Sequence, residues 1–147
     1  MIEVIKKDNV PDFCHKTPYS AGYDLYACLD EPVDINPLEI KLIDSGIRLN
    51  MLKEPYDGIC ALVLPRSGMS LKTNLRVCNS PGLCDADYQG NIKIIIQNIG
   101  STTERINPLD RIAQLVFITT KNPEIKFVDK FDVTTERGTG GFGSTGK

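Results

Sequence analysis

The sequence predicts an all-β protein with the form of a sandwich, a jelly roll or a distorted barrel. Short alternating or β-branched runs recur along the chain, and Pro and Gly separate them too often for long helices. The chain has 147 residues, which suits one domain with a core of its own. It contains neither an internal repeat nor a recognisable interdomain linker.

Six runs are predicted as strands, and they cover residues 2–6, 23–29, 38–49, 59–64, 91–98 and 112–119. In the third run Leu38, Ile40 and Leu42 share one face, which we expect to face the core, as in a strand with one solvated side. The runs near 91–98 and 112–117 are more continuously apolar, which indicates cover on both faces or a subunit contact. The one expected helix covers residues 67–73.

Charge and composition argue against several classes of function. A net charge of -2 and a pI near 5.4 give no basic surface for nucleic acid, and no apolar run is long enough to span a bilayer. We therefore expect neither nucleic acid nor a membrane as a partner. The five cysteines form no C-x-x-C pair and no signal peptide is evident, so we expect a reducing compartment, the cytoplasm or the nucleus. His15 is the only histidine, which argues against a His-rich zinc site or a Ser-His-Asp triad.

The segment 137–147 reads R-G-T-G-G-F-G-S-T-G-K and carries the first candidate site. It superficially matches a dinucleotide fingerprint and a P-loop, but both need a following helix that the sequence does not provide. Glycine amides, hydroxyl groups and the cation Arg137 would make a flexible strap around an anion, with Phe142 available to lie on a flat ring. The alternative is a disordered tail without a ligand.

Two further segments carry polar groups in turn-like surroundings. In G-L-C-D-A-D-Y-Q-G, at residues 82–90, strand periodicity places Asp85 and Asp87 on one face, with Ala86 and Tyr88 on the other. Such carboxylates could act as a base or hold a metal, although an isolated D-x-D turn is usually a solvated loop. In P-R-S-G-M-S, at residues 65–70, an arginine and a serine at a helix start would suit a phosphate, or would simply be an N-cap serine beside a surface arginine.

Taken in order, five segments resemble the motif series of the homotrimeric deoxyuridine triphosphatase (dUTPase) family. They are A-G-Y-D-L at 21–25, P-R-S-G at 65–68, G-L-C-D-A-D-Y-Q-G at 82–90, R-I-A-Q-L at 111–115 and R-G-T-G-G-F-G-S-T-G at 137–146. The match covers nearly the whole chain, and the overall sequence is also similar to poxviral members of the family. It implies a jelly-roll-like distorted barrel at 1–132, a flexible tail at 133–147 that closes over a neighbouring site, and a homotrimer with active sites at subunit interfaces.

The resemblance implies that dUTP is hydrolysed to dUMP and pyrophosphate with Mg²⁺ as the cofactor, which limits uracil in DNA and supplies dUMP for dTTP synthesis. By position, Asp85 would deprotonate the water that attacks the α-phosphorus, and Tyr88 would pack against the deoxyribose. Asp24 would contact the metal through water. The remaining substrate-binding residues would hold the uracil (Asn79, Gly82, Leu83), hold the phosphates (Arg66, Ser67, Gly68, Gln114), or fold over the nucleotide from another subunit (Arg137, Phe142, Gly143, Ser144, Thr145).

Three departures from the family pattern are a cysteine at Cys84, the Ser80-Pro81 step before Gly82, and Met69-Ser70 after the P-R-S-G motif. The Ser80-Pro81 step lies in the hairpin at residues 78–84, which would bind the uracil and which we call the uracil hairpin, and it puts the backbone path of this hairpin in question. Three alternatives stay open. They are a dCTP deaminase or bifunctional relative, a non-catalytic nucleotide sensor, and a structural jelly roll such as a capsid module. Deamination needs an acidic side chain that carries a proton to the base, and the hairpin offers no Glu for this role.

Overall fold

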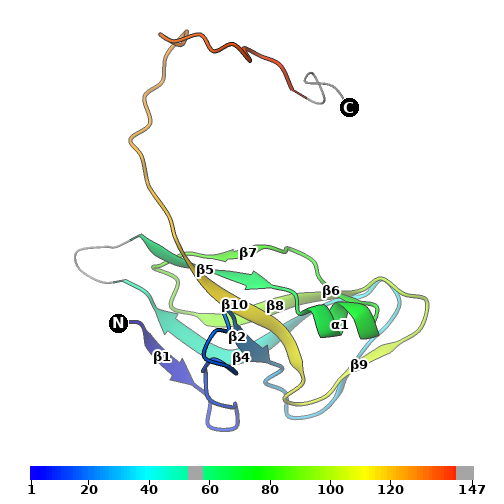
Figure 1. Ribbon diagram of the computed structural model, residues 1–147. Coiled ribbons are helices and arrows are strands. Elements are labelled where there is room, and N and C mark those ends of the chain that lie inside the picture. Colours follow the sequence, from blue (N-terminus) through cyan, green and yellow to red (C-terminus); the bar gives the residue numbers. More distant parts are fainter. Residues whose placement is uncertain (53–57, 142–147) are drawn as a thin grey trace.

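The structure is a computed structural model that describes residues 1–52 and 58–141 (Figure 1). Within these residues the chain forms ten strands and one helix, α1 (Ser67–Lys72). The strands are β1 (Glu3–Lys6), β2 (Tyr23–Tyr26), β3 (Val33–Ile35), β4 (Ile40–Asn50), β5 (Ile59–Leu64), β6 (Leu75–Val77), β7 (Gly82–Cys84), β8 (Asn91–Asn98), β9 (Glu104–Ile106) and β10 (Arg111–Thr119).

Two four-stranded sheets enclose the core. One has the order β1-β4-β8-β6 and the other β2-β10-β5-β7, while β3 and β9 form a two-stranded sheet beside them. All described strand pairs are antiparallel, and most neighbours are distant in sequence, since β10 lies between β2 and β5. This arrangement confirms the predicted all-β class in its jelly-roll-like, distorted-barrel form.

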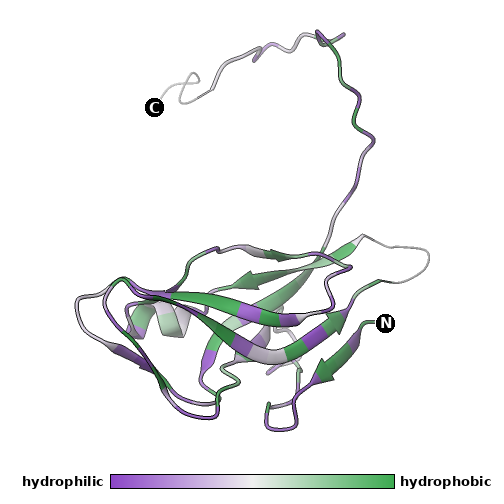
Figure 2. Cartoon of the chain, turned by 180° about the vertical axis from the view of Figure 1, so that it is seen from behind, coloured by the Kyte–Doolittle hydropathy of each residue, from purple (hydrophilic) through white to green (hydrophobic). Residues whose placement is uncertain are grey.

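The apolar strands β8 and β10 each contribute deeply buried residues to the core, together with β2, β4 and β5. Ile92, Ile94 and Ile96 of β8 are at most 3% exposed, and Ile112 and Leu115 of β10 at most 2%. Apolar and polar residues alternate along the strands of the barrel (Figure 2), as expected where one face is buried and the other is not. No helix in the described part of the chain is long and apolar enough to cross a membrane.

Most predicted elements are confirmed. The runs 59–64 and 91–98 coincide with β5 and β8, and the expected helix is α1, one residue shorter. The other four predicted strands exist, with ends shifted by one to three residues. The sequence did not predict β3, β6, β7 and β9, because three residues are too few to establish an alternation.

The predicted inward face of β4 is wrong. Leu38, Ile40 and Leu42 are 71%, 56% and 58% exposed, whereas Ile43 and Ile47, on the opposite face, are 2% and 1% exposed. Leu38 also lies before the strand, with a φ of 64°. Near the start of the strand the exposed face is the apolar one, with Glu39 and Lys41 opposite, so an apolar face in the sequence need not be a face buried in the core of the same chain.

After β10 the chain leaves the barrel. Residues 120–141, the C-terminal arm, extend away from it (Figure 1). The arm is not purely polar: Ile125, Phe127 and Phe131 are 75%, 94% and 87% exposed. Large apolar side chains gathered in one exposed segment usually mark a surface that another molecule covers.

Candidate active site

The first candidate site is a cavity of about 230 Å³ beside β7, the edge strand of its sheet, and we call it the β7 pocket. β7 pairs with β5 on one side, so the backbone groups along its other side have no neighbouring strand among the described elements. The cavity is lined by Val63, Asn79, Gly82, Leu83, Cys84, Asp85, Tyr88, Ile92 and Lys93. The sequence-predicted residues Asn79, Gly82, Leu83, Asp85 and Tyr88 are therefore together.

The chain between β7 and β8, residues 85–90, forms the 85–90 loop at this pocket. The backbone N–H of Tyr88 donates to the carbonyl of Asp85 at 3.1 Å, so the segment turns rather than remaining extended, and the predicted strand-like alternation from 85 to 88 is wrong. Tyr88 is 46% exposed, and its hydroxyl donates to the carbonyl of Asn91 at 3.0 Å. A Cβ on Gly90 would lie 2.5 Å from that hydroxyl oxygen, so the glycine leaves room for the ring.

Asp85 is exposed at the pocket, and within residues 1–52 and 58–141 no hydrogen bond or ion pair engages its carboxylate. The preceding residue behaves differently. Burial raises the pKa of the Cys84 thiol, and the nearby Asp85 and Cys60 raise it further, so Cys84 stays a protonated, apolar wall of the pocket. The one free charge of the loop facing this cavity is therefore available to a ligand or to water.

The hairpin that leads into β7 places a side-chain amide at the pocket. A Cβ on Gly82 would lie 3.0 Å from Nδ2 of Asn79, so the glycine permits this close approach. The Ser80-Pro81 peptide, which the sequence marked as a departure, is cis. The free edge of β7 and the Asn79 amide thus present donors and acceptors to the same cavity.

The second candidate site is a cavity of about 450 Å³ between the start of β2 and the end of β5, and we call it the arginine pocket. It is lined by Lys16, Ser20, Ala21, Gly22, Asp24, Arg66, Arg111, Gln114 and Val116. Here the structure brings together three further predicted residues, Asp24, Arg66 and Gln114. None of the residues that line this pocket lines the β7 pocket.

Two arginines share one carboxylate in the arginine pocket. Arg66 Nε donates to Oδ1 of Asp24 at 2.7 Å, and an Nη atom of Arg111 donates to Oδ2 at 3.2 Å. The Asp24 side chain is only 11% exposed, so the carboxylate of this ion pair is largely buried. The guanidinium N–H groups of the two arginines that do not contact Asp24 are available to bind an anion. Gln114 Nε2 donates to the carbonyl of Pro65 at 2.9 Å, and Gly22 leaves space for this side chain, because a Cβ there would lie 2.7 Å from Oε1 of Gln114.

The remaining residues of the P-R-S-G motif lie at the start of α1. Arg66 is the N-cap, and Ser67 is the first helical residue, so the alternative of an N-cap serine is wrong. No side-chain hydrogen bond caps the helix. Ser67 is exposed and the space around a Cβ on Gly68 is open to 4 Å, which leaves both residues accessible from solvent.

A family model described as dUTPase matches residues 8–146. The chain belongs to the dUTPase family. The deoxyuridine 5'-triphosphate nucleotidohydrolase of Paraburkholderia xenovorans is 44% identical over 147 residues, which is 100% of this chain and 95% of that protein. That of Tolumonas auensis is 47% identical over 133 residues, covering 90% of this chain and 85% of that protein. These relatives are bacterial and give no support to the poxviral likeness.

Solved dUTPase structures share the fold. The dUTPase of Staphylococcus bacteriophage 80alpha with dUPNHPP has a TM-score of 0.87 and 28% identity, with 100% of this chain and 99% of that chain covered. A mutant dUTPase from phage phi11 of S. aureus, in which a structural Mg(II) ion is coordinated, has a TM-score of 0.78 and 26% identity, with 90% and 99% covered.

In this dUTPase chain the described residues of the last motif, 137–141, line neither pocket. Arg137 is exposed, and its Nε donates to the carbonyl of Gly140 at 2.9 Å in a local turn of the arm. The other predicted tail residues, Phe142, Gly143, Ser144 and Thr145, lie outside the described residues.

Sequence reasoning missed three cationic residues that line the pockets. Lys16 and Arg111 line the arginine pocket, and Lys93 lines the β7 pocket. Arg111 stands at the head of a motif that was recognised, and its pairing with Tyr26 across β2 and β10 brings it beside Asp24. Lys93 alternates with buried isoleucines, a pattern that identifies an outward residue but gives no sign of a cavity.

Proposed function

We propose that the chain hydrolyses dUTP to dUMP and pyrophosphate, with the β7 pocket holding the nucleoside and the arginine pocket holding phosphates. The observation that carries this proposal is Asp85, an exposed carboxylate without a described partner, at the mouth of a cavity lined by Tyr88 and by the free edge of β7. Family membership supports the same reaction. Hydrolysis would remove dUTP as a source of uracil in DNA and supply dUMP.

In the β7 pocket, uracil would bind to the backbone of β7 and to the amide of Asn79. Edge-strand N–H and C=O groups can read the donor and acceptor pattern of a base edge, and a narrow cavity excludes larger groups such as the methyl of thymine. The Tyr88 ring would pack against the deoxyribose and leave no space for a 2′-hydroxyl. Its fixed position, set by the bond to the carbonyl of Asn91, supports this role.

Asp85 would act as the general base. Its carboxylate would accept a proton from a water molecule, whose oxygen attacks the α-phosphorus while the bond to the bridging oxygen breaks and pyrophosphate leaves. A carboxylate that no other group engages can orient and deprotonate water directly. The raised pKa of its neighbour Cys84 keeps a second anion out of the same pocket.

The arginine pocket would bind phosphates through Arg66 and Gln114, with Ser67 and Gly68 at the start of α1. Arg66 is already held by Asp24, so its guanidinium is oriented before an anion arrives. Arg111 and Lys16, which line the same cavity, add positive charge. A triphosphate requires several such donors, because its charge is spread over many oxygens.

The chain's residues fit Mg²⁺ carried by the substrate. Among the described residues no group of three or more His, Cys, Asp or Glu is placed to form a metal cage. Mg²⁺ commonly binds through substrate phosphates and keeps several waters, so one carboxylate, Asp24, would suffice to contact it through water. Both oxygens of Asp24 accept from arginines, but each has a further lone pair. When bound, the ion would neutralise charge on the phosphates.

The complete site would form only in an oligomer, which we propose is a homotrimer with each site shared between subunits. Three observations support more than one copy: the two pockets share no lining residue, the arm exposes apolar side chains, and Ile40 and Leu42 are exposed on β4. We propose a dUTPase domain at residues 1–132, which comprises the barrel and the first part of the arm, and a tail at 133–147, whose Arg137, Phe142, Gly143, Ser144 and Thr145 would close over the nucleotide of a neighbouring site.

The proposed reaction is tested by measuring pyrophosphate release with dUTP, dTTP, dCTP and UTP, each with and without Mg²⁺. We expect rapid release from dUTP alone and a strong dependence on Mg²⁺. Comparable hydrolysis of UTP or dTTP would contradict the assignment of the β7 pocket. Ammonia release from dCTP would instead favour the deaminase alternative, for which the hairpin at 78–84 provides no Glu.

A further inference from the structure

A bulge interrupts β4 opposite the point where the 85–90 loop enters β8. Asp44 pairs with Lys93 and Arg48 pairs with Asn91, so residues 45–47 of β4 stand opposite a single residue of β8. Gly46, inside the bulge, has a φ of 68°, and its N–H donates to Oδ1 of Asp44 at 2.8 Å. Bulges redirect the side chains of a strand and are frequent beside active sites. We call residues 44–48 the β4 bulge.

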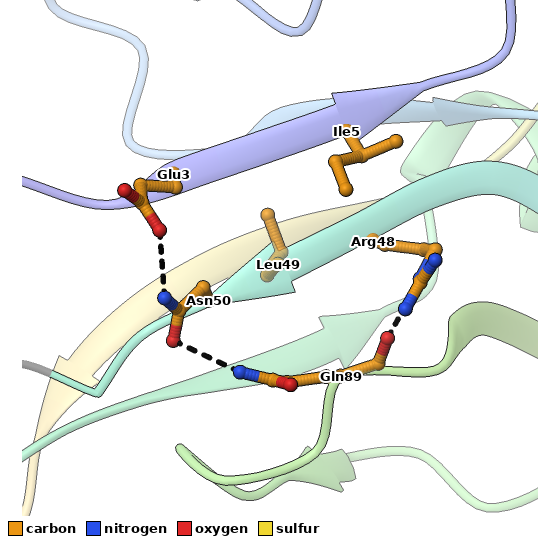
Figure 3. Close-up of a pocket in the computed structure, with 6 residues that line it drawn as sticks. All are labelled: Glu3, Ile5, Arg48, Leu49, Asn50 and Gln89. Atoms are coloured by element: carbon orange, nitrogen blue, oxygen red, sulfur yellow. Dashed lines mark hydrogen bonds between the residues drawn. The ribbon is translucent and has the colours of Figure 1, made fainter.

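Arg48, at the end of the bulge, contacts the loop itself. Its Nε donates to the carbonyl oxygen of Gln89 at 2.7 Å, while Nε2 of Gln89 donates to Oδ1 of Asn50 at 3.3 Å. Nδ2 of Asn50 in turn donates to Oε2 of Glu3 at 2.7 Å. Figure 3 shows this chain of contacts, which runs from β1 through β4 to the loop along a cavity of about 380 Å³.

Two other bulge residues fix the segment that follows. Asn91 Nδ2 donates to Oδ2 of Asp44 at 2.7 Å, and the carbonyl of the same asparagine accepts the hydroxyl of Tyr88. The hydroxyl of Ser45, which is fully buried, donates to the carbonyl of Ile92 at 2.7 Å. The β4 bulge therefore contacts the chain at residues 89, 91 and 92, immediately behind the loop.

We propose that Arg48 is a positioning residue for hydrolysis, because it holds the 85–90 loop against the β4 bulge and so fixes where Asp85 and Tyr88 lie. The proposal rests on the proposed function. The carboxylate of Asp85 has no partner of its own among the described residues, so the loop backbone decides its direction. A displacement of about 1 Å in a reacting group can cost about a hundredfold in rate, so a loosened loop has a measurable effect.

Substitutions of the two residues in this contact, Arg48 and Gln89, should have unequal effects. Arg48 binds a backbone carbonyl, which every substitution of Gln89 preserves. Arg48→Met removes the donor and keeps the length of the side chain, so we expect kcat for dUTP to fall about tenfold, with KM changed less than about threefold, because the uracil hairpin is untouched. Gln89→Ala removes only the longer bond to Asn50, and we expect a loss of at most about twofold.

Rescue and a matched control separate positioning from a general effect. Arg48→Lys keeps a cationic donor, and we expect it to recover kcat to within about threefold of the unmodified protein. Arg105→Met removes another exposed arginine, one paired with Asp34 through bonds of 2.6 and 2.8 Å at the small sheet, and we expect kcat to stay within about twofold. If Arg48→Met lowers kcat no more than Arg105→Met does, the proposal is wrong.

Hydrogen exchange tests the same contact without any activity. In Arg48→Met, we expect the amide of Tyr88, which donates to the carbonyl of Asp85, to exchange about tenfold faster, with the amides of Ile94 and Ile96 in β8 unchanged. Unchanged exchange at Tyr88, or equal acceleration throughout β8, would overturn the proposal. If the unmodified protein does not hydrolyse dUTP, the proposed function fails, while this measurement still decides whether Arg48 holds the loop.

A second variant covers the case in which Arg48→Met is poorly folded. In Asp44→Ala the side chain can accept neither the N–H of Gly46 nor the amide of Asn91, so both contacts are lost. The bond between Asn91 and Tyr88 then loses its support, and we expect kcat to fall about threefold with faster exchange at Tyr88. An unchanged kcat and unchanged exchange in this variant would also contradict the role of the bulge.

Discussion

The β7 pocket and the arginine pocket orient their charged side chains in different ways. Asp85 stands at the β7 pocket without a described partner, and its loop is held from behind by the β4 bulge. In the arginine pocket the groups hold one another, since Asp24 pairs with Arg66 and with Arg111. One site orients a free base through the backbone, and the other orients cations through a shared anion.

The difference follows from what each group must do. A base that accepts a proton from water must not already be neutralised by a cation, because an ion pair would stabilise its charged form and weaken it as a base. A cation that binds phosphate keeps its charge at every physiological pH, so a neighbouring carboxylate can orient it without switching it off. The comparison predicts that substitutions in the β7 pocket chiefly change kcat, and those in the arginine pocket chiefly change substrate binding.

The largest expected effect is that of Asp85→Asn. The amide keeps the shape of the side chain but cannot accept a proton, so we expect kcat to fall between about a hundredfold and ten-thousandfold while nucleotide still binds. Asp87→Asn, two residues along the same exposed loop, is the matched control and should change kcat little. Calorimetric binding of a non-hydrolysable dUTP analogue together with steady-state rates checks this, and near-normal turnover of Asp85→Asn would remove it as the base.

The second prediction tests whether the sites are shared between chains. Asp85→Asn and a chain ending at Glu136 should each be inactive, but mixed trimers should recover activity, because the first supplies a tail and the second supplies the base. For an equal random mixture about three-quarters of trimers are mixed, each with about one working site in three, which gives roughly a quarter of the unmodified rate. The two variants are refolded together, mixed trimers are verified by mass spectrometry, and background activity in them would exclude tails acting in trans.

The third prediction sharpens the assignment of the arginine pocket. Arg66→Met should lower kcat/KM for dUTP between about tenfold and a hundredfold, the range expected for one or two hydrogen bonds to a charged group. Binding of dUMP, which lacks the β- and γ-phosphates, should weaken less than about threefold. Arg105→Met serves again as the control arginine, and titrations with both nucleotides give the comparison. Equal losses for dUTP and dUMP would mean that Arg66 does not contact the two outer phosphates.

The smallest expected effect concerns the β4 bulge. Burial alone would raise the pKa of Asp44, but the bonds from the Gly46 N–H and the Asn91 amide, with the nearby Lys7, outweigh burial and hold the pKa below its usual value. The charged form therefore stabilises the fold above the pKa of the unfolded chain, and this stabilisation is lost as the pH falls through the folded pKa.

The unmodified protein should accordingly exceed Asp44→Asn in unfolding free energy by about 1 kcal/mol at neutral pH, and the difference should shrink below about pH 4. Urea unfolding at several pH values measures both quantities. A difference that stays constant down to pH 3 would show that the carboxylate charge does not contribute.

Much of the fold could be predicted from the sequence, because long strands repeat their pattern often enough to be recognised. β5 and β8 were predicted with their observed bounds, whereas β7, which forms the wall of the first pocket, has only three residues. The inward face of β4 was wrong because Ile40 and Leu42 are apolar and yet exposed in this chain. A sequence pattern identifies an apolar face, but it does not say whether the core or another chain covers that face.

In the candidate site, too, some residues could be predicted from the sequence and others could not. Motif order identified Asp85, Tyr88, Arg66 and Gln114, and the structure groups them into two pockets rather than one. The support from Arg48 could not have been predicted, because it depends on a bulge that shifts the register of β4 against β8. Arg48 moreover binds the backbone carbonyl of residue 89, which every residue type has, so the amino acid at that position does not reveal the contact.

The position of the arm in the chain also bears on how the protein is made. A ribosome completes the strands of the barrel, which end at Thr119, before it adds the exposed apolar residues of the arm. Because β10 joins β2 to β5, this sheet stays incomplete until β10 has been synthesised, so the barrel can close only late in synthesis. A contact made through the arm can therefore be formed only by a chain whose barrel strands have all been synthesised.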